Sequence, residues 1–304
     1  MIPNAIHCED LSKSYGGVRA VDHLRLEVPA GAIYGLVGPN GAGKTTAIKM
    51  LMNIVRPDAG HATVLGCDSR QIGPEQFTRI GYVSENQHMP DWMTVGYLMS
   101  YLKPFYPRWD DARADELLRQ FDLPLDRKLK NLSRGMWMKA SLASSLAYRP
   151  DLLVLDEPFS GLDPLVREDL IQGILDSADE TTILCSSHDL AEIETLASHI
   201  GYMERGILRF SEEMDTLTAR FRVVEVTVGT AALMPGNGRW PARWTRPEIA
   251  PSLVRFVDSM YDAERTDLDI RELFEGVTGV AAHPMPLKAI FLTMARSASP
   301  KGGR

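Results

Sequence analysis

A glycine-rich segment at residues 38–46 carries the residue types that bind phosphate. It fits the pattern G-x-x-x-x-G-K-T, and its residues are, in order, Gly38, Pro39, Asn40, Gly41, Ala42, Gly43, Lys44, Thr45 and Thr46. Backbone N–H groups in such a loop form a nest for an anion, and the positive end of the following helix points at it. Lys44 adds a charge toward the β- and γ-phosphates, and the Thr45 hydroxyl can ligate Mg²⁺. The segment predicts a nucleotide site, with a chance glycine-rich turn as the alternative.

Two adjacent carboxylates, Asp156 and Glu157, follow an apolar run at residues 152–155. A buried strand of a parallel sheet presents such residues at its carboxyl end, where ligands bind. Taken alone, the pair also fits a helix cap or a solvated turn. Downstream of a phosphate loop, we expect Asp156 to hold Mg²⁺ and Glu157 to act as general base on an attacking water.

Three further residues stand at the ends of predicted elements. His188 follows a strand predicted at residues 182–186; it either senses a γ-phosphate near Glu157 or has a structural role. Ser133 and Gly135 open a helix, where Ser133 fits an N-cap. A helix N-terminus is also an anion site. One chain with two anion sites and a single phosphate loop suggests that the second site serves a partner's nucleotide.

The elements that position these residues alternate between strand and helix. Residues 4–37 have the alternating pattern of β-structure, and residues 86–148 are helical in character. The strands at 152–155 and 182–186 flank a helix predicted at 165–178. This β-α-β order predicts an α/β fold with a parallel sheet.

The pattern changes beyond residue 205. We expect an accessory segment at residues 216–304, with strands near 224–228 and 253–257, a loop at 229–247, helices at 267–274 and 286–296, and a disordered tail at 297–304. The predicted ATP-binding domain is residues 1–215, with a helical subdomain at about 86–150.

Composition excludes several classes of protein. The chain of 304 residues carries 33 basic and 40 acidic residues, a net charge of −7, which argues against nucleic-acid binding. Its three cysteines have no metal-binding or disulfide spacing, so a reducing cytoplasm is expected. No apolar stretch has the length of a membrane-spanning helix. We therefore expect any membrane pathway to lie in another polypeptide.

The motifs, in this order, resemble the nucleotide-binding subunit of an ABC transporter over about residues 4–215. The resemblance implies a phosphate-loop NTPase: a RecA-like parallel sheet core with an antiparallel β subdomain and a helical signature subdomain, plus a small α+β C-terminal segment. It implies that Tyr15 stacks on adenine and that Asp163 links two nucleotide sites. Residues 132–136 resemble the signature motif, and residues 287–292 resemble a closing helix of the export-type branch.

Two departures from the family pattern favour that branch. The signature Leu-Ser-Gly-Gly-Gln has Arg134 and Met136 in place of a glycine and the glutamine. Arg134 either adds a cation near the partner's nucleotide or faces solvent. Glu85 stands where the family carries a glutamine; it can still contact water or help bind Mg²⁺, but it adds negative charge.

The resemblance implies a dimer in which two ATP molecules and Mg²⁺ are sandwiched head to tail, each between one chain's loop and the other's Ser133 and Gly135. The partners are a second ATP-binding subunit, identical or related, and integral permease subunits, with the chain at the cytoplasmic face of the membrane. Residues 85–92 transmit the motion, and the region of Trp92 and Met93 is either the docking surface or core. A non-transport ABC ATPase and a hydrolysis-impaired regulatory subunit are the competing hypotheses. The transported substrate cannot be read from the sequence.

Overall fold

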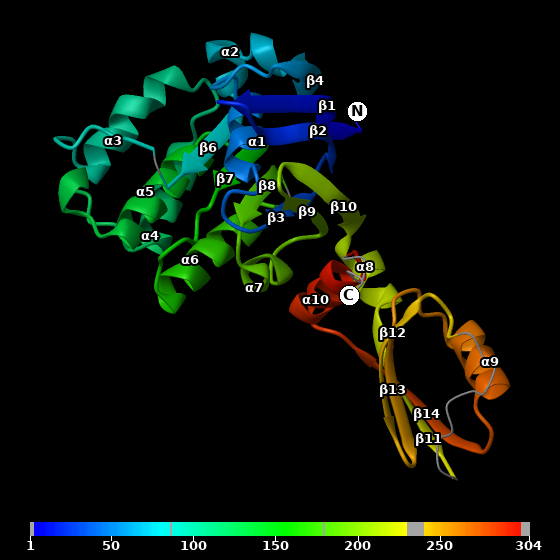
Figure 1. Cartoon of the computed structure of the whole chain (residues 1–304). Helices are drawn as coiled ribbons and strands as arrows, with labels where there is room; N and C mark the ends of the chain where they lie inside the picture. Colours follow the sequence, from blue (N-terminus) through cyan, green and yellow to red (C-terminus); the bar gives the residue numbers. More distant parts are fainter. Residues whose placement is uncertain (1–2, 86, 179, 230–239, 299–304) are drawn as a thin grey trace. The chain divides into compact units, whose positions relative to one another are not determined.

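The computed structural model describes residues 3–85, 87–178, 180–229 and 240–298, the last four without their side chains (Figure 1). The chain divides into two compact units, Met1–Ser211 and Glu212–Arg304, and each is described by itself. In the part of the chain that is described, none of the helices has the length and apolar character of a membrane span.

The first unit contains a six-stranded sheet in the order β10-β9-β3-β8-β7-β6. Its strands are β3 (Ile33–Val37), β6 (Ile80–Ser84), β7 (Leu152–Asp156), β8 (Thr182–Ser187), β9 (His199–Glu204) and β10 (Ile207–Glu213). Strand β3 pairs in parallel with β8 and β9, and β7 pairs in parallel with β6 and β8. The predicted α/β class with a parallel sheet is confirmed. β7 and β8 are buried throughout because both faces of a parallel sheet are covered.

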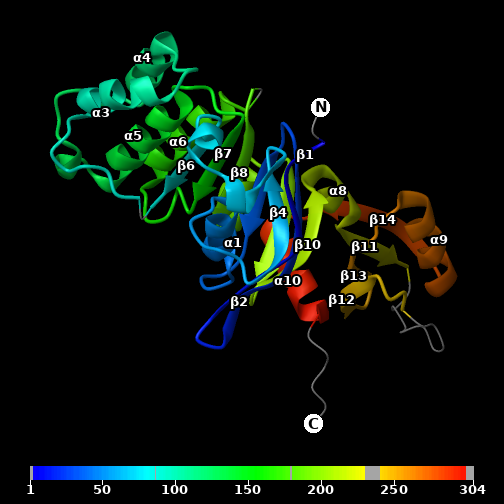
Figure 2. The same ribbon diagram turned by 90° about the horizontal axis from the view of Figure 1, so that it is seen from above.

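An antiparallel sheet in the order β2-β1-β4-β5 lies at one end of this unit (Figure 2). It comprises β1 (Asn4–Tyr15), β2 (Val18–Pro29), β4 (Ala59–Val64) and β5 (Cys67–Asp68). One face of β2 buries Leu24, Leu26 and Val28 in a core shared with α1 (Lys44–Leu51) and the parallel sheet. Burial of such side chains contributes about 1.5–3 kcal/mol each. This core fixes the loop between β3 and α1.

The helices α3 (Val95–Leu102) and α4 (Asp111–Gln120) lie at the other end of the unit, beyond α5 (Arg134–Leu146) (Figures 1 and 2). The remaining helices are α2 (Pro74–Phe77), α6 (Pro164–Leu175) and α7 (Leu190–Glu194), with 3-10 turns at Ser69–Gln71, Lys103–Phe105 and Leu129–Asn131. Side-chain caps start two of these helices: the oxygen of Ser133 accepts from Met136 N–H, as the sequence predicts, and that of Asp163 accepts from Val166 N–H, which was not predicted. Helix α6 stops three residues before the predicted 178.

The second unit is an α+β structure with a sheet in the order β12-β13-β11-β14. Its elements are α8 (Met214–Arg220), β11 (Arg222–Val228), β12 (Trp244–Ala250), β13 (Leu253–Asp258), α9 (Ala263–Leu273), β14 (Val277–Pro284) and α10 (Leu287–Ala298). Helix α9 covers one face of the sheet (Figure 1). Asp258 is fully buried and accepts hydrogen bonds from Trp244 Nε1 and Thr266 Oγ1.

Three sequence-based expectations for this unit were wrong. The loop predicted at 229–247 gives way to β12 from residue 244 onward, while residues 230–239 lie outside the described part. Strand β14 was not predicted. Helix α9 begins four residues before the predicted 267. β12 and β14 are the two edge strands of the sheet and are mostly exposed, so their sequences need no alternation of apolar and polar residues. Pro247 in β12 is tolerated because the strand lies at an edge. Of the tail, residues 297–298 belong to α10, and the rest is not described.

Candidate nucleotide site

The phosphate loop connects β3 to α1, and its glycines are required by close backbone approach. Gly41 and Gly43 have φ angles of 79° and 104°, which L side chains rarely adopt. A Cβ at Gly38 would collide with the Met203 carbonyl, and one at Gly43 with the Ala20 carbonyl. The loop is therefore held against neighbouring backbone, with its N–H groups at the start of α1.

Lys44 is buried, and its ammonium group contacts both the phosphate loop and Glu157, the residue expected to act as general base. Its Nζ donates to the Gly38 carbonyl at 2.6 Å and lies 3.0 Å from Glu157 Oε1. Glu157 in turn accepts at Oε2 from His188 Nδ1, 2.7 Å away. The structure thus brings together three residues that sequence analysis singled out from three separate segments.

Asp156 and Thr45 form a pair of oxygen donors beside this cluster. Thr45 Oγ1 donates to Asp156 Oδ1 at 3.0 Å, and Ser186 Oγ donates to the same oxygen at 2.9 Å. Burial raises the pKa of Asp156, and the nearby Glu157 charge raises it further. No set of three or more His, Cys, Asp or Glu side chains within the described ranges can hold a metal by itself. A hydroxyl and one carboxylate fit Mg²⁺, which takes its other ligands from phosphate and water.

The backbone of Glu157 has an unusual conformation that a hydrogen bond stabilises. Its φ of 54° lies in the left-handed region that non-glycine residues rarely adopt, and its N–H donates to Ser186 Oγ at 3.0 Å. Strain of this kind persists where surrounding structure fixes it, often at functional sites. Ser186 therefore holds the carboxylate of Asp156 and the backbone of Glu157. The sequence shows Ser186 near His188, but nothing in the pattern predicts these hydrogen bonds.

Tyr15 ends β1 and is half exposed, as an adenine-stacking aromatic must be. Lys13 Nζ lies 5.5 Å from its ring centroid. Asp58 clamps this strand end: it accepts from Lys13 Nζ at 2.7 Å and from Ser14 N–H at 2.8 Å. Sequence analysis missed Asp58, because a carboxylate 44 residues from Ser14 carries no local signal.

Ser133, Gly135 and Asp163 belong to a second locality, where α5 and α6 begin. Ser133 and Asp163 cap these helices with their side chains. Gly135 is buried against α6, and a Cβ there would lie 2.7 Å from Val166 Cγ1. The site residues thus fall into two groups, one around Lys44 and one at the start of α5 and α6.

Comparisons with known proteins identify the family. The sequence profile of the ABC transporter family matches residues 21–160. The ABC transporter ATP-binding protein YtrB of Bacillus subtilis is 32% identical over 227 residues, which cover 74% of this chain and 77% of YtrB. The chain belongs to the ABC transporter family. As a member, it is an ATP-binding subunit and an ATPase.

Two other relatives have more specific names. The bacitracin transport ATP-binding protein BcrA of Bacillus licheniformis is 35% identical, with 71% of this chain and 72% of BcrA covered. The daunorubicin/doxorubicin resistance ATP-binding protein DrrA of Streptomyces peucetius is 39% identical, with 66% and 63% covered, so this chain spans less than two thirds of DrrA. A solved structure of an ATP-binding subunit of an ABC transporter matches with a TM-score of 0.64 and 26% identity, covering 71% of this chain and 92% of that one.

The departures from the ABC pattern have partners within the chain. Arg134 is half exposed and pairs with Glu85 of the same chain: its Nη2 lies 2.5 Å from Glu85 Oε2. The carboxylate expected to contact water or Mg²⁺ is therefore engaged by the signature segment. Met136 Sδ accepts from Arg127 Nη1 at 3.4 Å.

The helical end of this ABC domain carries an exposed row of aromatic rings. Trp92 is 62% exposed, whereas Met93 is buried, so only the first of these two residues is available on the surface. From Trp92 the rings continue through Tyr97, Tyr101 and Phe105, with successive centroids 5.5, 6.4 and 5.5 Å apart. We call these four side chains the aromatic row.

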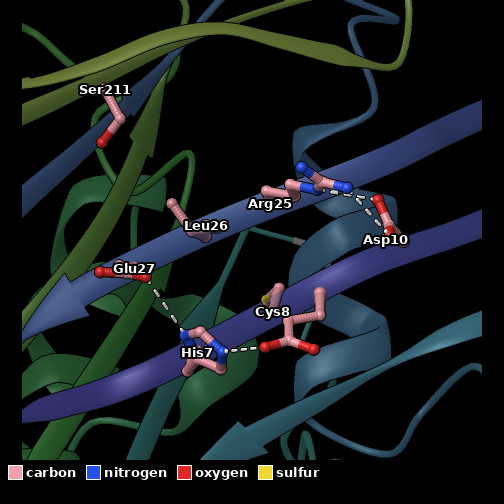
Figure 3. Close-up of a pocket in the computed structure, with 8 residues that line it drawn as sticks. His7, Cys8, Asp10, Arg25, Leu26, Glu27 and Ser211 are labelled. Atoms are coloured by element: carbon pink, nitrogen blue, oxygen red, sulfur yellow. Dashed lines mark hydrogen bonds and ion pairs between the residues drawn. The ribbon is translucent and has the colours of Figure 1, made fainter.

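A hollow of about 470 Å³ lies apart from the nucleotide site, on the antiparallel sheet (Figure 3). It is lined by His7, Cys8, Glu9, Asp10, Arg25, Leu26, Glu27 and Ser211. Its charged groups satisfy one another: Arg25 pairs with Asp10 at 2.9 Å, and His7 lies 3.0 Å from Glu9. We assign it no ligand.

Proposed function

We propose that this chain is the ATP-hydrolysing subunit of an exporter, driving a separate membrane permease from the cytoplasmic face. Two copies, or this chain and a related one, enclose two ATP molecules head to tail. The observation that carries the proposal is that the described residues form two groups of site residues, the Lys44 group and the group at the start of α5 and α6, of which the first alone includes the phosphate loop. The names of DrrA and BcrA, a drug-resistance protein and a bacitracin transport protein, favour export.

The residues of the Lys44 group divide the reaction between them. Backbone N–H groups of the loop and Lys44 bind the phosphates, and Tyr15 stacks on adenine. Glu157 accepts a proton from the attacking water as the bond between the γ-phosphorus and the oxygen of ADP breaks. His188, 2.7 Å from Glu157, orients this carboxylate and contacts the γ-phosphate. Mg²⁺, held by Thr45 and Asp156 when bound, neutralises charge on the phosphates.

The second group acts on the ATP bound to the partner. Ser133 and the N–H groups at the start of α5 contact its γ-phosphate, and Asp163 links the two sites. The aromatic row is proposed as the docking surface for the permease, because apolar patches of this kind on a surface mark protein contacts. We expect residues 85–92 to transmit motion between this surface and the nucleotide site.

Mixing two inactive variants tests the head-to-tail arrangement. Lys44→Ala removes the phosphate charge, and Ser133→Asp places a negative charge against the partner's γ-phosphate while keeping a good helix cap. We expect each variant alone to lose ATP hydrolysis and the mixture to regain part of it, because a mixed dimer contains one intact composite site. Ser133→Asn is the neutral control and stays active. No recovery on mixing, with both variants folded and dimeric, would contradict the arrangement.

A cross-linking experiment tests the docking surface. A photo-cross-linking residue at Tyr97 in native membranes is expected to yield an adduct with a polypeptide that resists alkaline extraction. The matched control is Leu175 at the end of α6, which is also exposed. Equal adducts at both positions, or none at Tyr97, would refute the assignment of the aromatic row.

A further inference from the structure

The two positions at which the chain departs most in charge from the family pattern, Glu85 and Arg134, contact each other. They are 49 residues apart in sequence, yet Arg134 Nη2 lies 2.5 Å from Glu85 Oε2. The backbone N–H of Glu85 donates to the Asp156 carbonyl at 3.4 Å, immediately before the proposed base. Arg134 itself stands between Ser133 and Gly135. One ion pair therefore joins the edge of one nucleotide site to the segment proposed to contact the other nucleotide.

The same guanidinium also touches a third segment. A Cβ built on Gly161 would lie 3.1 Å from Arg134 Nη1, so the arginine lies directly over this glycine. Gly161 has a φ of +67° and precedes Asp163, the cap of α6. A side chain at Gly161 would require the end of the arginine to shift slightly. Arg134 is thus in contact with two segments while belonging to a third.

The exposure of this pair shows that it does not hold the fold together. The side chains of Arg134 and Glu85 are 51% and 30% exposed. Ion pairs in such surroundings contribute about 0–1 kcal/mol to stability. A contact this weak opens and closes at small cost, which suits a coupling element better than a structural one.

Charge gives the pair a second effect. Glu85, Asp156 and Glu157 are three carboxylates at the ends of neighbouring strands β6 and β7. Lys44 lies near Glu157, and Arg134 neutralises Glu85. Without Arg134, an unpaired negative charge would remain beside the position of a triphosphate. Loss of the arginine should therefore be more harmful than loss of the glutamate charge.

We propose that the Arg134–Glu85 ion pair positions the signature segment against the catalytic edge and couples the two nucleotide sites. Both residues are positioning residues for hydrolysis. The proposal rests on the proposed function, since it assumes that Ser133 and Gly135 serve the second nucleotide.

A double-mutant cycle tests the pair. We expect Arg134→Ala to lower kcat about fivefold and Glu85→Gln to lower it less. The double variant should be no slower than Arg134→Ala alone, and the exchanged pair Glu85→Arg with Arg134→Glu should recover activity lost in either single reversal. The affinity of one chain for a fluorescent ATP analogue and the thermal unfolding midpoint should stay unchanged. Hydrogen exchange over residues 132–140 should quicken in both single variants without nucleotide.

If the reductions in kcat of the two single variants simply multiply in the double variant, the coupling is refuted. Unchanged hydrogen exchange over residues 132–140 in the single variants would refute it as well. This failure is distinct from failure of the proposed function. If the mixed-variant experiment regains activity but the cycle shows no coupling, the head-to-tail sites stand and the role of the ion pair is wrong. If mixing regains nothing, the proposed function itself is wrong.

Discussion

The clamp around Tyr15 offers a sharp test of the adenine contact. Asp58 accepts from Lys13 Nζ at 2.7 Å and from Ser14 N–H at 2.8 Å, and neither of these partners belongs to the phosphate loop. Asp58→Ala removes both hydrogen bonds and frees the strand end that carries Tyr15. We expect weaker ATP binding and unchanged chemistry.

The size of the effect follows from the exposure of the clamp. Charge-assisted hydrogen bonds can contribute about 1.5–3 kcal/mol, but the Asp58 side chain is 49% exposed, which reduces the value of its ion pair. We therefore expect a modest effect, about a fivefold rise in KM for ATP. The stacking itself, about 1–3 kcal/mol by analogy with bases on aromatic platforms, sets the upper limit.

Steady-state ATP hydrolysis and titration with a fluorescent ATP analogue measure this prediction. Asp58→Asn, which keeps an acceptor for Ser14, should fall between wild type and Asp58→Ala. Glu27→Ala, an exposed carboxylate on β2, serves as the control and should change neither constant. A drop in kcat with KM unchanged would refute the reasoning.

Three further predictions concern stability. Burial raises the pKa of Glu192, so the folded state binds its proton more tightly, and the free energy of unfolding falls as pH rises from about 4 through that raised pKa. Glu192→Gln should therefore be more stable than wild type at pH 7 in urea unfolding. A difference in stability that does not shrink toward pH 4 would contradict this. Asp258→Ala should destabilise the second unit by about 3–5 kcal/mol, seen in tryptophan fluorescence, with ATP affinity unchanged; Asp267→Ala on exposed α9 is the control, and equal losses would count against the buried network. Gly173→Ala should cost about 1–3 kcal/mol, because a Cβ would lie 2.5 Å from Phe121 Cζ; a thermal midpoint equal to that of wild type would disprove this packing.

The sequence predicted the elements around the nucleotide site well, because each carries a local signal. The apolar run before Asp156, the glycines before Lys44 and the cap at Ser133 are all readable from neighbours in the chain. The edge strands β12 and β14 were missed because edges need no apolar alternation. Hydrogen bonds between distant segments, such as that from Ser14 to Asp58, leave no trace in local patterns.

The ion pair between Arg134 and Glu85 shows the same limit most clearly. Each residue can be identified from the sequence as a departure from the family pattern. Arg134 differs from the family's glycine in charge and size, and Glu85 differs from the family's glutamine in charge alone. Only the fold brings them within 2.5 Å. Their pairing is a property of tertiary structure, and the alternatives considered for Arg134 in the sequence did not include it.

The most direct test of the central claim is ATP hydrolysis by Glu157→Gln. The variant keeps the shape of the side chain and an acceptor for His188 but cannot take the proton from water. We expect hydrolysis to fall by about 10²–10⁴-fold, while ATP remains bound and uncleaved on the protein. Release of phosphate at close to the wild-type rate would show that Glu157 is not the base and would contradict the account.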